Sequence, residues 1–348
     1  MYIKENDIEY EKKRWSMVSK KDVAREAGVS ATSVSYYINK SGYVSAEAGK
    51  KIQAAIERLH YTPNQIARSL KIKDSKQFVF LCNEIRNPFF AQLVYQATRE
   101  AYRQDYSILF SNVIDDEQYL KKICGYQVSG VFVSNNRISC EAIESVRQFG
   151  IPIVMLQDSD WESFHPDITL IHIEQKDIFG EITRHLYENG FKRLHYISGA
   201  VSSGSPDEKT KAFLAAANLD GERNVSYDIT TSEQAAVYIR TSWRKIGYPD
   251  AIICTNDAVA EGVIFGLNEL GIRVPKDVGV VGYDNTFQSR FYIPSISTVD
   301  FGGDMLGKMI IKMLIDKMQG KQVGNKSITP VFLARASSTR NGGKAQYK

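Results

Sequence analysis

The sequence predicts a small all-α headpiece at the N-terminus, followed by an α/β core of two lobes with parallel, doubly wound sheets. Three observations lead to this fold class. A basic segment near the N-terminus contains short helical patterns separated by cap and turn residues. After Ser75 strand and helix patterns alternate, which is typical of parallel sheets with right-handed crossovers. The strands fall into two successive sets, and two sets predict two lobes.

Composition excludes several classes of protein. Hydrophobic residues make up 43% and charged residues 24% of the 348 residues, as in ordinary soluble domains. No apolar run reaches the roughly 20 residues of a membrane span. Residues 1–20 lack the apolar segment of a signal peptide, so we expect a cytoplasmic protein. Buried, reduced thiols are expected instead of a zinc site, because no C-x-x-C spacing occurs among Cys82, Cys124, Cys140 and Cys254.

The charge is unevenly distributed along the chain. Residues 17–75 contain ten basic and five acidic side chains, a net charge of +5. The remainder carries 34 basic and 35 acidic side chains and is nearly neutral. A basic end on a neutral body is typical of a phosphate-binding module attached to another domain, although a solvated charged surface has the same composition.

The first helix of the headpiece has a recognisable start and end. Ser19 and Asp22 have the spacing of a capping box, in which each side chain bonds the backbone N–H of the other residue. The predicted helix covers Lys20–Ala27. Gly28 follows at the place where a tight turn requires a positive φ.

A second short helix, Ala31–Ile38, follows a cap at Ser30. Ala24, Gly28 and Val34 then have the spacing of a helix-turn-helix, with a small residue, a turn and an apolar wedge. The outer face of this helix carries short hydrogen-bonding groups and one aromatic ring: Thr32, Ser33, Ser35, Tyr36 and Asn39. Such a face suits a DNA groove, and an ordinary polar surface is the alternative.

Two more helical patterns complete the N-terminal region. Ser45 caps a helix with Ile52, Ile56 and Leu59 on one face. Gly49 inside it costs about 1 kcal/mol relative to Ala, and the sequence offers no explanation for it.

Thr62 and Pro63 then suit the start of a helix of about two turns that joins the headpiece to the core. Because so short a helix is marginal in water, it could form only when something supports it.

The core contains two expected sets of strands. The first comprises 77–82, 106–113, 130–134 and 153–156. The second comprises 168–173, 193–198, 251–255 and 278–283. Because ligands of such folds bind beyond the carboxyl ends of the strands, we expect a site between the two lobes.

The order and spacing of several segments closely resemble the lac repressor (LacI/GalR) family of bacterial transcription regulators. In the headpiece and the junction these are Lys21–Ser30 (KDVAREAGVS), Gly42–Ser45 (GYVS), Tyr61–Asn64 (YTPN) and Ala67–Leu70 (ARSL). In the core they are Asn87–Phe90, Asn256–Asp257, Val280–Asn285, Ile293–Val299 and Ala334–Thr339. The resemblance extends from about Val18 to Thr339.

The resemblance implies a helix-turn-helix headpiece and a periplasmic-binding-protein-like core. The implied function is transcription regulation by a repressor that binds a pseudo-palindromic operator as a homodimer, with a sugar or related neutral metabolite as effector and no cofactor. The expected domains are an extension (1–17), the headpiece (18–61), a hinge helix and linker (62–75), the core (76–340) and a tail (341–348). The N-lobe would comprise about 76–171 and 303–330, and the C-lobe about 172–299 and 331–340.

The resemblance also implies which residues meet DNA. Ala31, Thr32 and Tyr36 match positions that read base edges. The third is usually Arg in the family, which reads guanine through two hydrogen bonds. Tyr36 can donate one hydrogen bond and pack on a thymine methyl group, so we expect a departure from the family's common operator. Phosphate-contacting positions match Ser19, Ser30, Ser33, Ser35, Asn39 and Tyr43.

In the hinge, Leu70 matches the residue that wedges into the minor groove and kinks the operator. Ala67 matches its companion at that step, and Asn64 lies at the start of the same segment.

The effector positions implied by the resemblance are Phe89, Gln157, Asp207, Asn256 and Asp284. Phe89 suits stacking on a sugar or base, and the polar side chains suit hydroxyl groups. Asp207 departs from the family, which usually has Arg there, and an acidic side chain disfavours an anionic effector. Two alternatives remain open: the site binds nothing, or Lys209 takes the role of the Arg.

Other functional classes fit the sequence less well. A solute-binding protein shares the two-lobed core but would have a signal peptide and no headpiece. An enzyme on a Rossmann-like sheet would carry a phosphate loop, a dinucleotide fingerprint, an H-E-x-x-H or a G-x-S-x-G motif, and the sequence has none of them. Control by a protein co-regulator, or no small effector at all, remains an alternative within the resemblance.

Overall fold

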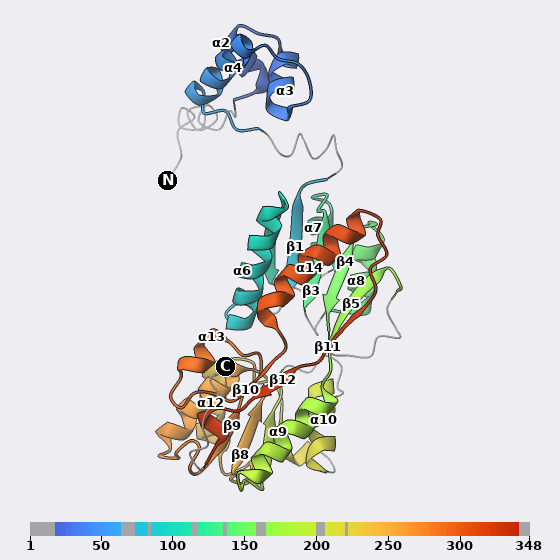
Figure 1. Ribbon diagram of the computed structural model, residues 1–348. Coiled ribbons are helices and arrows are strands. Elements are labelled where there is room, and N and C mark those ends of the chain that lie inside the picture. Colours follow the sequence, from blue (N-terminus) through green and yellow to red (C-terminus); the bar gives the residue numbers. More distant parts are fainter. Residues whose placement is uncertain are drawn as a thin grey trace, which may run out of the picture. The chain divides into compact units, whose positions relative to one another are not determined.

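A computed structural model of the chain describes residues 18–63, 74–82, 85–112, 117–134, 138–157, 165–199, 206–219 and 222–340 (Figure 1). The chain divides into two compact units, Met1–Ile72 and Lys73–Lys348. None of the described helices is long and apolar enough to cross a membrane.

The first unit is a bundle of three helices, α2 (Lys20–Ala27), α3 (Ala31–Asn39) and α4 (Ala46–Arg58). Its capping matches the sequence prediction: Ser19 and Asp22 form the capping box, and Gly28 ends α2 with φ 65°. A small apolar core of Val23, Ala24, Ala27, Val34, Ile52, Ala55 and Tyr61 holds the three helices together.

The glycine inside α4 has an explanation in the tertiary structure. A Cβ atom on Gly49 would lie 3.2 Å from Cε2 of Tyr37, which is on α3. The Tyr37 hydroxyl donates a hydrogen bond to Oε1 of Gln53, one turn further along α4 (3.1 Å). The missing Cβ at Gly49 therefore lowers helix propensity but leaves room for the ring of Tyr37 between the two helices.

The second unit begins with a six-stranded sheet in the order β11-β5-β4-β3-β1-β2. All its neighbouring strands run parallel. The strands are β1 (Gln77–Cys82), β2 (Ser107–Asn112), β3 (Gly130–Ser134), β4 (Ile153–Leu156), β5 (Ile168–Ile173) and β11 (Lys326–Ile328). The helices packed on it are α6 (Pro88–Arg103), α7 (Glu117–Cys124), α8 (Cys140–Arg147) and α14 (Gly303–Met318).

Alternate residues of these strands belong to different hydrophobic cores. Phe78, Phe80 and Phe132 pack with apolar residues of α6 and α14. Val79 and Val131 pack with α7 and α8 on the opposite face. Figure 1 shows α6 and α14 side by side over one face of this sheet.

One expected strand assignment was wrong. The order of the strand patterns predicts residues 168–173 in the second set, whereas β5 pairs in parallel with β4 and lies in the first sheet. The physical reason is burial: Ile168 and Leu170 complete the core beneath α7 and α8 together with Ile153. The chain passes to the second lobe only after β5.

The second lobe contains a four-stranded parallel sheet in the order β7-β6-β8-β9 and an antiparallel pair, β10 with β12. The strands are β6 (Leu194–Ile197), β7 (Val225–Ser226), β8 (Ala251–Cys254), β9 (Gly279–Val281), β10 (Thr298–Asp300) and β12 (Val331–Leu333). The helices are α9 (Lys176–Glu188), α10 (Glu208–Ala217), η2 (Glu222–Asn224), α11 (Ser232–Ser242), α12 (Asp257–Glu269), α13 (Phe287–Phe291) and η3 (Ala336–Ser338). The predicted α/β architecture with parallel sheets is confirmed.

Candidate functional site

Helix α3 presents a polar outer face to solvent. Its N-cap is Ser30, whose Oγ accepts a hydrogen bond from the backbone N–H of Ser33 (3.0 Å). Val34 is fully buried and fixes the inner face. Thr32 and Tyr36, one turn apart, are exposed on the other side. The helix thus holds a small hydroxyl and an aromatic ring in a fixed relation on one surface.

Several of the predicted phosphate-contacting side chains bond to one another. The Ser30 and Ser33 hydroxyls lie 2.9 Å apart, and Nδ2 of Asn39 donates to Oγ of Ser35 (3.2 Å). Tyr43, in the loop after α3, is 90% exposed. These groups lie at the surface of the headpiece, where a polyanion could reach them.

Positive charge remains on the headpiece after its ion pairs are counted. Arg25 pairs with Asp22, Lys51 with Glu47, and Arg58 with Glu26. Exposed pairs of this kind contribute about 0–1 kcal/mol and are screened by salt. Within the described residues, no ion pair with a carboxylate forms at Lys20, Lys21, Lys40 or Lys50. These lysines can therefore attract phosphate groups.

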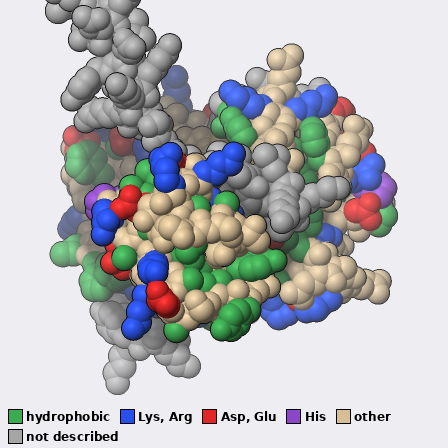
Figure 2. Space-filling view, turned by 90° about the horizontal axis from the view of Figure 1, so that it is seen from above, with side chains coloured by type: hydrophobic (Ala, Val, Ile, Leu, Met, Phe, Trp, Pro, Cys, Tyr) green, Lys and Arg blue, Asp and Glu red, His purple; other side chains and the backbone are tan. Residues whose placement is uncertain are grey.

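Positively charged side chains are dispersed over the face of the molecule that Figure 2 shows. Lys and Arg side chains occur at several separate places on the face seen in Figure 2, with polar and hydrophobic surface between them.

The predicted hinge residues Asn64, Ala67 and Leu70 lie outside the described residues.

The effector residues predicted from the sequence follow the carboxyl ends of strands. Phe89 lies in the first turn of α6, after β1, and is 6% exposed. Gln157 follows β4, and Asp284 follows β9 with φ 106°. Both side chains are partly buried. The carboxyl ends of both sheets thus carry the predicted residues.

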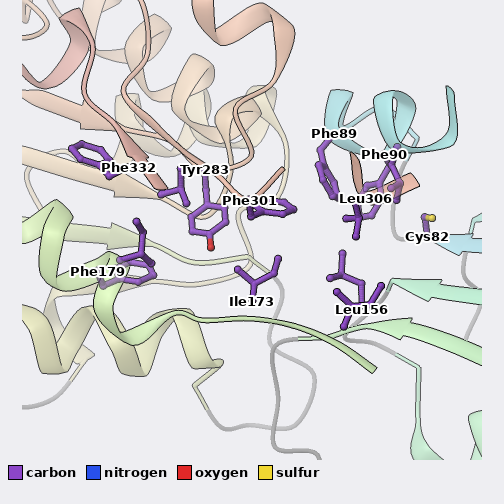
Figure 3. Close-up of a cluster of buried hydrophobic side chains, with 14 of the residues drawn as sticks. Cys82, Phe89, Phe90, Leu156, Ile173, Phe179, Tyr283, Phe301, Leu306 and Phe332 are labelled. Atoms are coloured by element: carbon purple, nitrogen blue, oxygen red, sulfur yellow. The ribbon is translucent and has the colours of Figure 1, made fainter. Parts of the chain in front are cut away.

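Aromatic rings form a row at this place. The ring centroids of Phe89 and Phe301 are 5.2 Å apart, and those of Phe301 and Tyr283 are 5.8 Å apart. Figure 3 shows Phe301 between the other two rings, with Leu156 and Ile173 nearby. All three rings are buried and belong to the apolar core, so a ligand can stack on them only if neighbouring side chains or the lobes move apart.

Two of the predicted effector residues serve as helix caps. Oδ1 of Asp207 accepts a hydrogen bond from the backbone N–H of Thr210 at the start of α10 (2.8 Å). Oδ1 of Asn256 accepts one from Val259 at the start of α12 (2.8 Å). Each cap satisfies an otherwise unpaired N–H group of its helix.

Lys209 carries the positive charge that faces the aromatic row. Its Nζ lies 3.7 Å from the ring centroid of Tyr283 and 3.4 Å from the carbonyl oxygen of Thr255. The Tyr283 hydroxyl donates to Oε1 of Gln175 (2.9 Å). A lysine in the first turn of a helix opposes the helix dipole. Lys209 is the residue that the sequence left open as a replacement for the Arg of the family.

A small pocket adjoins the row. Its volume is about 50 Å³, and it is lined by Phe89, Gln92, Asp284, Asn285, Arg290, Asp300, Gly302, Gly303 and Asp304. Because a water molecule takes up about 30 Å³, a sugar-sized ligand requires the side chains or lobes to separate. Three carboxyl groups against one guanidinium favour neutral hydroxyl-bearing or cationic ligands over anions.

A buried carboxyl group supports the loop that carries Asp284. Asp257 is fully buried and accepts hydrogen bonds from the backbone N–H of Thr286 (2.7 Å) and from Oγ1 of Thr298 (2.6 Å). Burial raises the pKa of Asp257 to about 6. Arg335 donates to Oδ1 of Asn285 (2.6 Å) in the same loop. The loop after β9 is therefore fixed from two sides.

Comparison with known proteins agrees with this geometry. Residues 20–64 match the family model described as bacterial regulatory proteins, lacI family. Residues 183–338 match a periplasmic binding protein-like domain. An HTH-type transcriptional repressor PurR of Actinobacillus pleuropneumoniae is 31% identical over 313 residues, which cover 87% of this chain and 92% of the relative. The chain belongs to the lacI family of bacterial regulatory proteins.

Another relative and two solved structures match this chain over nearly its whole length. The PurR repressor of Mannheimia succiniciproducens is 29% identical over 322 residues, which cover 90% of this chain and 95% of the relative. A solved structure of the lac repressor dimer bound to operator and the anti-inducer ONPF has a TM-score of 0.78 at 23% identity, covering 93% of this chain and all of that chain. A complex of the transcriptional regulator CelR with cellobiose has a TM-score of 0.66 at 22% identity, covering 92% and 99%.

Membership of the lacI family fixes the general role of the two units. The chain is a DNA-binding transcription regulator, and its α/β unit has the fold of the sensing cores in that family.

Proposed function

We propose that this chain is a repressor that binds a pseudo-palindromic operator as a homodimer and responds to a small effector bound in the core. The main observation in favour of DNA binding is the outer face of α3. Thr32 and Tyr36 are exposed there on a helix capped by Ser30. Together with the lysines that lack a carboxylate partner, this face can enter a major groove.

The individual DNA contacts follow from exposure and from the family. Ala31, Thr32 and Tyr36 would meet base edges. The side chains proposed for phosphate contacts are Ser19, Ser30, Ser33, Ser35, Asn39 and Tyr43. Asn64, Ala67 and Leu70 would act in the hinge, with Leu70 as a wedge in the minor groove.

The DNA-binding proposal is tested by selecting a randomised double-stranded library with the full-length protein. We expect enriched half-sites arranged as an inverted repeat, with the base preference changed at one pair by Tyr36→Ala. Tyr126→Ala, at an exposed position after α7, is the matched control and leaves the preference unchanged. Enrichment no greater than that for bulk DNA, or a single unrepeated site, would refute the proposal.

The homodimer is supported by an exposed apolar patch on the C-lobe. Phe265, Phe287, Phe291 and Ile293 are between 52% and 87% exposed. The rings of Phe287 and Phe291 lie 4.9 Å apart, and the Tyr292 hydroxyl donates to the carbonyl of Glu261 on α12 (3.2 Å). Large exposed apolar patches mark interaction surfaces, and a second copy of this chain is the proposed partner.

The effector is proposed to be a neutral or amine-bearing polyhydroxyl compound, such as a sugar. Once the side chains or lobes have separated, the aromatic row would supply a stacking surface, and the carboxyl groups of the pocket would accept hydrogen bonds from hydroxyl groups. Lys209 is proposed to take the cationic role at the end of the row, while Asp207 caps its helix. The likeness of fold to CelR, whose complex contains cellobiose, favours the same class.

The effector proposal is tested by a thermal-shift screen of sugars, amino sugars and nucleosides. A bound ligand raises the melting temperature by mass action. We expect Asp284→Asn to reduce the shift and Asp105→Asn to leave it unchanged. Asp105 is a matched control because it also has a positive φ but lies at an exposed turn after α6. A hit that is insensitive to Asp284→Asn would place the ligand elsewhere.

A further inference from the structure

The ring of Tyr36 lies against the backbone of Gly42, in the loop that follows α3. A Cβ atom added to Gly42 would lie 2.8 Å from both Cγ and Cδ2 of Tyr36 and 3.0 Å from Cδ1. Real Cβ atoms essentially never lie this close to another heavy atom, because non-bonded carbon atoms repel each other at such distances. The base of the tyrosine ring therefore occupies the space that any other side chain at position 42 would need.

Backbone conformation does not explain this glycine. Gly42 is absent from the residues with positive φ, whereas Lys40, two residues earlier, has φ 51° at the reversal of the chain. Gly42 is also exposed, so a buried core does not demand a small residue. The Tyr36 ring is the neighbour that an added Cβ would meet.

The loop cannot easily move away from the ring. The backbone N–H groups of Lys40 and Ser41 both donate to the carbonyl oxygen of Tyr36, the latter at 3.3 Å. The chain therefore folds back over the residue whose ring it contacts. Cγ is bonded directly to Cβ of Tyr36, so relief of a clash there requires rotation about χ1, which moves the ring to another staggered position.

The neighbouring tyrosine shows a different arrangement. Tyr37 also packs against a glycine, Gly49, but its hydroxyl is bonded to Gln53. Within the described part of the chain, the Tyr36 hydroxyl has no hydrogen-bond partner, and the side chain is 43% exposed. The ring of Tyr36 is thus fixed at its base while its polar end is available to a ligand.

We propose that Gly42 is a positioning residue for DNA recognition, because its missing Cβ allows the Tyr36 ring to lie against the loop and directs the hydroxyl to one base pair. This inference rests on the proposed base-reading role of Tyr36. It adds a specificity determinant in a loop that itself need not touch a base.

The test is a double-mutant cycle in the full-length protein. Wild type, Gly42→Ala, Tyr36→Ala and the double variant are assayed on the duplex selected by the wild type, on all single-base variants of its half-site and on a duplex of random sequence. We expect Gly42→Ala to weaken discrimination roughly tenfold at the base pair affected by Tyr36→Ala, about the value of one specific hydrogen bond. In the Tyr36→Ala background the glycine substitution should have no further effect.

Gly49→Ala is the matched control, because it makes the same substitution beside the neighbouring tyrosine. It is expected to change the melting temperature of the headpiece but not base discrimination. Affinity for the random duplex should be the same in all variants, since it depends on phosphate contacts. If Gly42→Ala destabilises the headpiece, removal of the ring by Tyr36→Ala should restore its melting temperature.

The outcomes separate this inference from the proposed function. No change of preference in Tyr36→Ala removes the base-reading role, and the positioning role with it. A change in Tyr36→Ala without one in Gly42→Ala overturns the positioning role alone. Equal effects of Gly42→Ala in both backgrounds, or a loss of stability that ring removal does not restore, also overturn it.

Discussion

Tyr36 offers a base edge one hydroxyl and a flat apolar ring, where most family members offer an arginine. The structure leaves its ring on the exposed face of α3 and its base against Gly42. At this scale specificity depends on the number and direction of hydrogen bonds. One donor on a fixed ring discriminates less than a planar guanidinium with two parallel N–H groups.

Tyr36→Arg should shift the preference at that base pair to guanine, because arginine can bond to two acceptors of guanine at once. We expect a change of about tenfold or more in relative affinity, measured by competition between duplexes that differ at that pair. Tyr43→Arg provides the contrast: a new charge in the exposed loop should raise affinity for all duplexes and steepen its salt dependence. A Tyr36→Arg variant with the wild-type base preference would contradict the reading role.

His195 on β6 makes the stability of the core depend on pH. It is 1% exposed, its Nε2 lies 2.8 Å from Oγ of Ser226, and burial lowers its pKa to about 4. Because the pKa is depressed, the unfolded chain binds a proton as the pH falls from about 6.5 to 4 while the native state does not. The free energy of unfolding should therefore fall over this range, by roughly 3 kcal/mol from this residue.

His195→Gln should remove this component, measured as the difference from wild type in urea unfolding at each pH. The difference is needed because burial raises the pKa of Asp257 to about 6 and of Glu261 to about 7. Raised carboxyl pKa values make stability fall as the pH rises through that region, the opposite sign. Identical pH profiles for wild type and His195→Gln would show that the buried imidazole does not contribute.

Helix ends determine which polar groups near the aromatic row are available to a ligand. At the start of α10, the Asp207 carboxylate is bonded to the backbone of Thr210 and the side chain of Ser198. Lys209, in the same first turn, lies over Tyr283. A cap and a cation two residues apart thus have different surroundings because successive helical side chains point about 100° apart.

Substitutions at the start of α10 should separate stability from effector binding. Asp207→Ala is expected to lower the free energy of unfolding of the core by about 1 kcal/mol, and Asp207→Asn to leave it nearly unchanged, since Asn caps equally well. Lys209→Met should alter the thermal shift caused by an effector while changing stability little. A loss of the effector shift in Asp207→Asn, with Lys209→Met unaffected, would instead favour the acidic residue as the ligand contact.

The whole molecule combines a basic headpiece with a core that carries an apolar patch on the C-lobe. A palindromic operator needs two headpieces, so assembly and DNA affinity should be coupled. The patch around Phe291 and Ile293 is the place where that coupling can be broken without disturbing the fold, because both side chains are more than 60% exposed.

Phe291→Asp and Ile293→Asp should shift the protein from dimer to monomer in analytical ultracentrifugation at micromolar concentration. Operator affinity should fall by at least tenfold, while affinity for an isolated half-site changes little. Tyr126→Asp, an exposed aromatic after α7, is the control and should leave the dimer intact. Dimers that persist in both C-lobe variants would show that another surface holds the subunits together.

The sequence by itself determined the local features of this protein. Caps and turns of the headpiece, such as Ser19, Gly28 and Ser30, depend on neighbouring residues only, and so their positions follow from local chemistry. The alternating α/β pattern and the family followed from residues whose spacing is visible along the chain. The strand patterns also placed Phe89 and Asp284 just beyond strands, whereas their role as effector positions came from the family resemblance alone.

Tertiary structure decided what depends on contacts distant in sequence. Strand β5 joined the first sheet because its apolar residues complete a core with α7 and α8. The glycines at 42 and 49 acquired a reason only when the tyrosine rings of α3 were placed beside them. Likewise Lys209 approaches Tyr283 across 74 residues of sequence. Such close approaches are set by packing, which sequence periodicity does not encode.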